Sequence, residues 1–216
     1  MIHLSSVVSL FLLFNPSFTF QQHPPDWELR KNENGIAVYT RYAEGSDLKE
    51  VRVVSEVNST LNGCVALIMD LKNYPNWIYA CSEASVLSVV NSQERYQYQV
   101  TDVPWPVSDR DVVSYFKIGQ DESTKIVTTT NSSDPGRIPE KEGRVRVQYF
   151  KTTYKLSPLP NGKVKVEFEL YVDPGGNIPA WLINANIVTA PYKTTLAMMK
   201  QLTAYQTASL PFIKEK

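Results

Sequence analysis

Side chains that commonly carry out acid–base or nucleophilic catalysis near neutral pH are scarce in this chain. Its two histidines, His3 and His23, both precede residue 26 of the 216. The rest of the chain has no imidazole, which excludes Ser-His-Asp and Cys-His catalysis and histidine-ligated zinc from it. The sequence Asp173-Pro174-Gly175-Gly176 is not a phosphate loop, because it lacks the Lys and the Ser or Thr that such loops require.

Asp109 and Asp111 are the remaining candidates for acid–base chemistry. They stand two residues apart in a predicted strand, so both side chains point to one face. Two neighbouring residues of one strand cannot flank a substrate as the paired carboxylates of glycosidases do. We interpret them as polar strand residues or as partners of nearby cations. The sequence therefore predicts no catalytic residue, no metal site, no cofactor and no enzymatic activity, and it favours binding.

Two cysteines do not form a disulfide framework. Cys64 falls in an apolar helical pattern and Cys81 follows an aromatic loop, so the sequence predicts two buried free thiols. A bridge between them is the alternative, because an oxidising compartment would permit it and spacing alone does not place the two Cβ atoms.

The charge balance excludes an electrostatic mode of binding to nucleic acid. The chain has 22 Lys and Arg residues against 22 Asp and Glu, evenly spread, and its formal net charge is zero. An anionic membrane is also not expected to hold it by charge alone. The composition, 43% apolar and 20% charged, is that of an ordinary globular protein and is consistent with one domain.

The N-terminus resembles a targeting segment. The apolar run 7–14, followed by Asn15-Pro16-Ser17, predicts a signal peptide over 1–20 and a linker over 21–25. We therefore expect an exported protein, periplasmic or extracellular. The alternative is an apolar N-terminal strand in a cytoplasmic protein, since no Lys or Arg precedes the apolar run.

The predicted elements form an α+β pattern. A short helix is expected over 26–33, ended by Asn34-Gly35, and a helix with one apolar face follows the capping residues Ser59 and Thr60. Period-two alternation predicts strands over 36–42, 49–57, 84–90, 95–101, 109–118, 125–130, 144–156 and 163–172. A long amphipathic helix over 178–205, kinked by Pro191, ends the domain. An antiparallel sheet with one apolar face against a helix is the architecture that fits this order.

Four separated motifs resemble the START family, the steroidogenic-acute-regulatory-related lipid-transfer domains. They are Trp27 with 35–41 (GIAVYTR), Asp70-x-x-x-Tyr74-x-x-Trp77, 104–111 (PWPVSDRD) and 173–184 (DPGGNIPAWLIN). The resemblance covers 26–205 and leaves 206–216 as a C-terminal tail. It implies a helix-grip fold of the START and Bet v 1-like type, in which a curved antiparallel sheet wraps around a long C-terminal helix. It also implies a tunnel for one lipid or other hydrophobic molecule, in a family that is mostly non-catalytic.

The resemblance implies that Arg110 points into the cavity and meets a ligand head group or a buried acid. The preceding strand offers Gln97 and Gln99 where some relatives have an acid, and a purely structural ion pair of Arg110 is the alternative. The other expected ligand contacts are aromatic and apolar side chains of strands, loops and the last helix: Tyr98, Tyr96, Trp77, Trp105, Phe168, Trp181, Leu182, Ala185, Val188 and Met199. The loop 134–143 is a candidate entrance flap.

The sequence thus favours non-catalytic binding or transfer of a lipid or other hydrophobic ligand between sheet and C-terminal helix. We expect a monomer with transient membrane contact and no nucleic-acid partner. One alternative is a helix-grip enzyme of the aromatase or cyclase type, acting on a polyketide-like substrate with Arg110, Tyr98 or Asp111 as its polar groups. Another is an interaction module whose core is filled by its own side chains.

Overall fold

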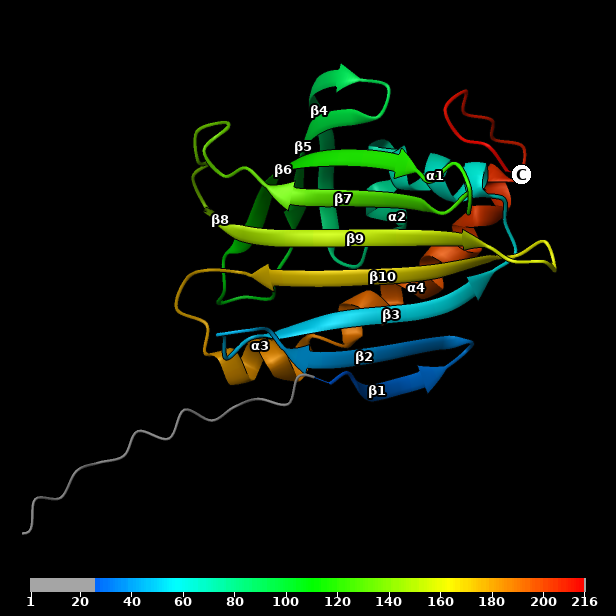
Figure 1. Ribbon diagram of the computed structural model, residues 1–216. Helices are drawn as coiled ribbons and strands as arrows, with labels where there is room; N and C mark the ends of the chain where they lie inside the picture. The colour runs from blue at the N-terminus through cyan, green and yellow to red at the C-terminus, as the bar shows by residue number, and fades with distance from the viewer. Residues whose placement is uncertain (1–25, 216) are drawn as a thin grey trace, which may run out of the picture.

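One curved sheet is the main element of the fold in the computed structural model, which describes residues 26–215 (Figure 1). Its ten strands are β1 (Glu28–Glu33), β2 (Ile36–Tyr42), β3 (Lys49–Val57), β4 (Cys81–Asn91), β5 (Glu94–Thr101), β6 (Asp109–Gln120), β7 (Val127–Ser133), β8 (Arg144–Arg146), β9 (Tyr149–Pro158) and β10 (Val164–Asp173). The spatial order is β1-β2-β3-β10-β9-β7-β6-β5-β4, all antiparallel. The short strand β8 pairs with β6 in parallel.

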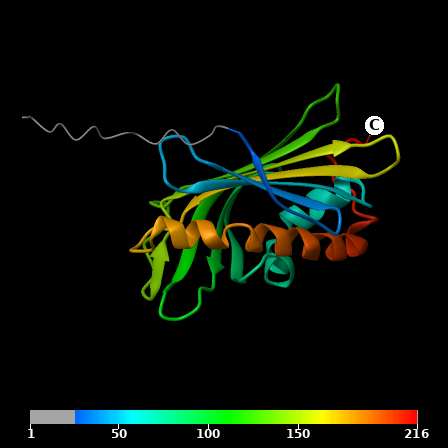
Figure 2. The same cartoon turned by 90° about the horizontal axis from the view of Figure 1, so that it is seen from below.

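The helices lie on one face of this sheet, which we call the inner face; the opposite one is the outer face (Figure 2). They are α1 (Leu61–Met69), α2 (Tyr74–Trp77), α3 (Ala180–Asn186) and α4 (Thr189–Gln201), with the 3-10 turns η1 (Leu71–Asn73) and η2 (Leu202–Tyr205). Helix α4 lies against β2 and β3, and α1 lies against β9. The predicted α+β helix-grip architecture is confirmed.

The core fills the space between α1, α4 and the sheet. Val164, Val166 and Phe168 of β10 face it, as the alternation over 163–172 predicts, and the rings of Phe168 and Tyr154 are 4.5 Å apart. Helix α1 begins where predicted, because the side chain of Thr60 accepts a hydrogen bond from the backbone N–H of Gly63.

Both cysteines are buried and unbridged, as predicted. Burial raises the pKa of the Cys64 thiol to about 12 and that of the Cys81 thiol to about 11. Neither thiol is therefore a ready nucleophile near neutral pH.

The predicted helix over 26–33 is wrong, because this segment is strand β1. Asn34 and Gly35 have positive φ values of 53° and 72°, which is the backbone of a two-residue hairpin turn. The turn pairs β1 with β2 instead of ending a helix. The predicted strand over 144–156 is likewise divided into β8 and β9, which pair with different strands.

The C-terminal helix is interrupted rather than continuous over 178–205. Helix α3 ends at Asn186 and α4 begins at Thr189, one turn before the expected kink at Pro191. Proline has no N–H to donate to the carbonyl of Ile187, so the hydrogen-bond ladder is broken there. The break leaves α3 and α4 as two segments along the same line (Figure 2).

The predicted C-terminal tail packs onto the domain as far as residue 215. Ile213 is part of the core, and Leu210 donates its backbone N–H to the side chain of Asn62. The Glu215 carboxylate accepts hydrogen bonds from the backbone N–H groups of Leu61 (3.0 Å) and Asn62 (2.8 Å). The tail therefore caps the N-terminus of α1.

The predicted signal peptide over 1–20 and linker over 21–25 lie outside the described residues. Within 26–215, none of the helices combines the length and the apolar character that crossing a bilayer requires.

Candidate functional site

The inner face of the sheet is tightly covered near α1 and only partly covered towards α3. Near α1, the inner side chains Val166, Leu156 and Val127 are at most 2% exposed. Towards α3, inner side chains of the same sheet are half-buried. We call this set the inner-face site: Gln99, Asn131, Phe150, Thr152, Leu170 and Val172.

Strand register brings the inner-face site together. Leu170, Thr152 and Asn131 are successive partners across β10, β9 and β7, and Val172 pairs with Phe150 in the next row. Because adjacent strands are about 4.8 Å apart, these five side chains form one continuous surface, and Gln99 lies on the same face of the sheet on β5, beyond β6. Amide and hydroxyl groups lie on it beside apolar groups, and this composition suits an amphiphilic molecule.

Several buried polar atoms on the inner side of the fold lack a hydrogen-bond partner. They are Thr40 Oγ1, Ser55 Oγ, Asn131 Oδ1, Arg95 Nη2 and Trp77 Nε1. An unsatisfied buried polar group costs about 1–3 kcal/mol, and native proteins have few of them. Five such atoms on one side of the sheet suit a bound molecule with polar groups of its own.

Arg110 faces inward, but main-chain carbonyls occupy its guanidinium. It donates to the carbonyl of Ser108, to that of Pro174 (3.4 Å) and to that of Gly175 (3.3 Å). Its partner is thus neither a carboxylate nor Gln97 or Gln99. Burial lowers the pKa of Arg110, and the nearby Asp109 opposes this shift. Arg110 fixes the turn that leads from β10 into α3.

Helix α3 is held to the sheet by one side chain and otherwise covers little. It has no buried residue. The side-chain oxygen of Asn184 accepts the backbone N–H of Lys49 (2.9 Å), and its amide donates to the carbonyl of Asp47 (2.8 Å). Helix α3 therefore has few contacts that fix its position.

Tyr98 and Tyr96 lie on the outer face, opposite to the inner-face site. Tyr98 packs with Val100 and Val113 in a second apolar cluster, which Ile138 covers. The Tyr98 hydroxyl donates to Asp111 (3.0 Å). The sheet alternation places Tyr96 on the same side, where the Arg137 guanidinium lies 3.7 Å from the centre of its ring. The structure does not bring these two tyrosines to the helices.

Asp111 forms a buried ion pair with Arg146 on the outer face. Arg146 Nε and Nη2 each lie 2.9 Å from one Asp111 oxygen. Arg146 also donates to the carbonyls of Pro135 (2.7 Å) and Ile138 (3.1 Å). The loop 134–143, expected as an entrance flap, is thereby fastened onto the outer face.

The remaining predicted contacts fall into two groups. Trp77 and Phe168 belong to the core, and Val188 and Met199 pack against it. Trp105 is 91% exposed in its loop and Trp181 is 71% exposed on α3, and Leu182 and Ala185 of α3 are exposed as well. The structure therefore brings four of the predicted contacts into the core and leaves these four at the surface.

The inward-facing polar residues of β5 and β7 are not among the ligand contacts that the sequence predicts, which are mostly aromatic and apolar. Arg95, Gln97 and Gln99 face inward, opposite Phe116, Ser114 and Val112 of β6. The signal was in the parity of β6: once Arg110 is taken to face inward, the strand pairing assigns the Gln residues to the same side.

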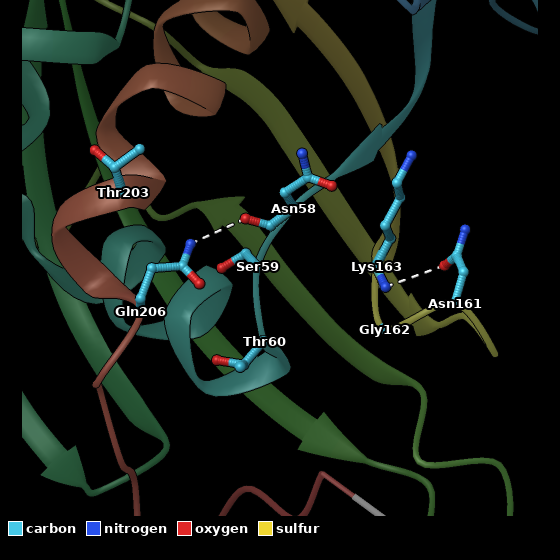
Figure 3. A pocket seen from close by; sticks show the side chains of 8 residues that line it. All are labelled: Asn58, Ser59, Thr60, Asn161, Gly162, Lys163, Thr203 and Gln206. Atoms are coloured by element: carbon cyan, nitrogen blue, oxygen red, sulfur yellow. Dashed lines mark hydrogen bonds between the residues drawn. The ribbon is translucent and has the colours of Figure 1, made fainter.

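A pocket at the other end of the sheet has a different character. Figure 3 shows it between the start of α1, the β9–β10 turn and η2, with a lining of Asn58, Ser59, Thr60, Asn161, Gly162, Lys163, Thr203 and Gln206. None of these is an apolar side chain, so the pocket does not suit a hydrophobic ligand. Within 26–215, no cluster of three or more His, Cys, Asp or Glu side chains is placed to hold a metal.

Comparison with known proteins identifies the family. The START domain model matches residues 20–204. The chain is 34% identical over 169 residues to an uncharacterized protein of Pseudomonas aeruginosa, covering 78% of this chain and 83% of that one. It is 28% identical over 165 residues to the phosphatidylcholine transfer protein of Rattus norvegicus, covering 74% and 75%.

The fold comparison agrees with the sequence comparison. The crystal structure of a STAR-related lipid transfer protein from Xanthomonas axonopodis superposes with a TM-score of 0.76 at 30% identity, covering 82% of this chain and 98% of that one. These matches agree with the helix-grip architecture and with the four sequence motifs in 35–41, 70–77, 104–111 and 173–184. The chain therefore belongs to the START domain family.

Proposed function

We propose that this protein binds one lipid or other hydrophobic molecule between the inner face of its sheet and helices α3 and α4, and transfers it without catalysis. The observation that carries the proposal is the half-buried inner-face site, with the unpartnered Asn131 Oδ1 in it and further unpartnered polar atoms on the same side of the fold, in a chain of the START family. Its relative in Rattus norvegicus is named as a phosphatidylcholine transfer protein, which supports a lipid as the ligand class.

The energetics suit reversible transfer. Burying one methylene from water gains about 0.8 kcal/mol, so a long acyl chain could gain on the order of 12 kcal/mol against water. A lipid that leaves a membrane was already out of water, and its tail gains little by moving. Selectivity must then come from the polar groups at the inner face and from its shape.

The carboxylates that were candidates for acid–base catalysis form structural contacts away from the inner-face site. Asp111 is bound to Arg146 on the outer face, and Asp109 accepts the backbone N–H of Val103 (3.0 Å). Tyr98 lies on the outer face too, and carbonyls occupy Arg110. These contacts support binding without catalysis, and no observation favours the aromatase or cyclase alternative.

The proposal includes export and action as a monomer that touches membranes transiently. The uncharged apolar run 7–14 motivates export, and the exposed Trp105 and Trp181 motivate membrane contact, because tryptophan is favoured at membrane interfaces. N-terminal sequencing of the protein recovered from its native compartment would show whether residues 1–20 are removed. An intact N-terminus on a cytoplasmic protein would contradict export.

Native mass spectrometry and organic extraction of the purified protein test the ligand, and transfer of a fluorescent lipid between vesicles tests the activity. Thr152 and Thr153 provide a matched pair, because both are half-buried on β9 and they face opposite sides of the sheet. We expect Thr152→Trp, at the inner face, to abolish loading and transfer, and Thr153→Trp to retain both. Equal effects of the two variants, or no hydrophobic ligand and no saturable lipid binding by the unaltered protein, would contradict the proposal.

A further inference from the structure

Arg95 presents a buried positive charge to the inner face without an acidic partner. Its residue is 8% exposed, and within the described chain its guanidinium takes part in no ion pair. An arginine stays protonated in a protein, so a full charge is buried there. A buried charge without a counter-ion is costly, and natural structures normally provide one.

Neutral groups orient this guanidinium, with Tyr74 close to it as well, and Nη2 has no acceptor at normal hydrogen-bond distance. Nε donates to the side-chain oxygen of Gln97 (3.1 Å), and Nη1 donates to the carbonyl of Met69 at the end of α1 (2.8 Å). Nη2, with its two N–H groups, has no acceptor. The ring of Phe116 supports the guanidinium at 4.8 Å. The group is thus held in place while its remaining donors are unsatisfied.

The charged groups around Arg95 do not supply the missing anion. Asp70 acts on it electrostatically, but a carboxylate oxygen of Asp70 accepts from the Tyr205 hydroxyl (2.7 Å) and Asp70 forms no ion pair with Arg95. Burial lowers the pKa of Arg95, and Tyr74 and Asp70 oppose the shift without cancelling it. The surroundings therefore leave the charge under-compensated.

A second unpartnered donor neighbours the side chain of Tyr74, which also interacts with Arg95. The Trp77 ring packs edge-on against Tyr74, with centroids 5.4 Å apart. Trp77 is 2% exposed, and its Nε1–H has no acceptor. Indole nitrogen and guanidinium are both donors only, so each calls for an acceptor.

Strand register connects Arg95 to the inner-face site. Arg95 is the partner of Phe116, and Phe116 is the partner of Asn131, on β5, β6 and β7. Only one strand separates the backbone of Arg95 from that of Asn131, a distance of about 10 Å. Arg95 and the unpartnered Asn131 Oδ1 therefore lie in one row of the inner face, on either side of Phe116.

We infer that Arg95 and Trp77 form an anion subsite, and that the ligand of this protein is an amphiphile with a carboxylate or phosphate group bound there. This inference rests on the proposed function and names its ligand class. An ionised group would accept from Arg95 Nη2 and from Trp77 Nε1, and it would neutralise the buried charge. A neutral hydrophobic molecule would leave both donors unsatisfied.

The test compares ligands that differ only in charge. Palmitate and methyl palmitate displace a neutral fluorescent hydrocarbon probe from the purified, delipidated full-length protein at about pH 8, with palmitoyl lysophosphatidic acid as the phosphate-bearing amphiphile. Since a hydrogen bond to a charged group contributes about 1.5–3 kcal/mol, we expect the unaltered protein to prefer each anion over the methyl ester by about 10- to 100-fold.

Three single variants test which residues cause the preference for the anionic ligand. We expect Arg95→Met to lose it while still binding methyl palmitate, and Trp77→Phe, which retains the ring, to reduce it several-fold. Arg137→Met is the matched control, because that guanidinium stacks on Tyr96 at the outer face, and it should retain the full preference. If Arg95→Met fails to fold, two other variants decide the question. We expect Arg95→Lys to retain part of the preference for the anion, and the double variant Arg95→Lys, Trp77→Phe to lose it.

The possible failures are distinguishable. Equal binding of palmitate and methyl palmitate, or an unchanged preference in Arg95→Met, overturns the anion subsite and leaves the proposed function intact. Displacement of the bound amphiphile by millimolar inorganic phosphate alone overturns the assignment of the subsite to a ligand head group. Failure of every hydrophobic probe and amphiphile to bind the unaltered protein overturns the proposed function and this inference together.

Discussion

On β5 the polar side chains Arg95, Gln97 and Gln99 face the helices, whereas its aromatic and apolar side chains, such as Tyr98 and Val100, face outward. Gln97 is 2% exposed on the inner side, and Tyr98, next to it in the chain, is 1% exposed on the outer side. Both faces are covered, because the segment around Ile138 packs onto the outer one. Burial by itself therefore does not distinguish the two faces, and the proposed binding face rests on the unsatisfied Arg95 Nη2 and Asn131 Oδ1 of the inner side.

Asp111 makes the outer cluster depend on a single buried ion pair. Replacing Asp111 by Ala leaves the Arg146 guanidinium buried with carbonyl partners only, and we expect the free energy of unfolding to fall by about 3–5 kcal/mol. The double variant Asp111→Ala, Arg146→Met removes the stranded charge and should recover part of the loss. Urea denaturation of the three proteins measures this. A loss below about 1 kcal/mol in the single variant would contradict the interpretation.

The Asp111 carboxylate also makes the free energy of unfolding depend on pH. Burial favours a higher pKa for Asp111, but hydrogen bonds from Arg146 and Tyr98 outweigh it and hold the pKa below the ordinary value of 3.8. The pKa of Glu167 is also lowered, because bonds from Arg52 and Lys165 outweigh the effect of burial. The folded protein thus binds these protons less tightly than the unfolded chain, so their stabilisation is complete above pKa values of 3.8 and 4.5 and is lost at lower pH.

Urea denaturation between about pH 6 and about pH 3 checks this dependence. We expect a decline in the free energy of unfolding that is confined to the acid end, and a shallower decline in Glu167→Gln. A free energy of unfolding that stays constant down to about pH 3, or one that rises there, would contradict the assignment.

The sequence pattern predicts those helices and strands whose formation depends on interactions within the segment itself. Helix α1 and strands such as β6 and β10 were predictable because their caps and alternation lie within each segment. The Asn34-Gly35 turn fits either a helix end or a hairpin, and only pairing with β2 resolves it. The division of 144–156 arises because Arg146 turns to Asp111 and Val147 donates its N–H to the Asp111 carbonyl, a contact that no local pattern contains.

The candidate site was predictable only in part, because the contacts that decide it are also distant in sequence. The sequence identifies Arg110 as inward-facing and the last helix as its neighbour. The inward direction of Arg110 assigns Gln99 rather than Tyr98 to the inner face only once the pairing of β5 with β6 is known, and the loop that covers Tyr98 on the outer face is more than 30 residues away in sequence. The predicted ligand contacts on β5 were therefore its aromatic side chains, which face outward, and not its inward-facing polar side chains.

Helix α1 depends on the last residues of the chain. Its first N–H groups have no partners within the helix, and the Glu215 carboxylate accepts two of them, with Asn62 Nδ2 as a third donor at 2.7 Å. We expect Glu215→Ala to lower the free energy of unfolding by about 1–2 kcal/mol. Glu122→Ala, at an exposed turn, is the control and should change it by less than about 0.5 kcal/mol. Equal values for the two variants in urea denaturation would show that the cap contributes nothing.

The two ends of the molecule differ in how completely their side chains are buried. The end formed by α1, η2 and the tail contains the most completely buried side chains, including Leu61, Leu156 and Leu202. The end formed by α3 and the turn at Pro174 has a helix without buried residues over half-buried inner side chains. Regions with few buried contacts open at lower free energy than the core does. Helix α3 is thus the element of this fold best placed to open and close the inner-face site.

Asn184 and Asn186 allow this to be tested within α3 itself. Asn184 bonds to the backbone at Lys49 and Asp47, whereas the side chain of Asn186 bonds only to the carbonyl of Leu182 in its own helix (2.9 Å). Losing the cross-links of Asn184 should cost about 1–1.5 kcal/mol of local stability, so Asn184→Ala should speed hydrogen exchange in 180–186 about tenfold. Asn186→Ala should change it little, and α4 should keep its protection in both variants. If α3 is the moving element, Asn184→Ala also releases a bound fluorescent lipid faster. Equal exchange rates in the two variants, or loss of protection spreading through α4, would show that α3 does not open as a unit on the Asn184 contact.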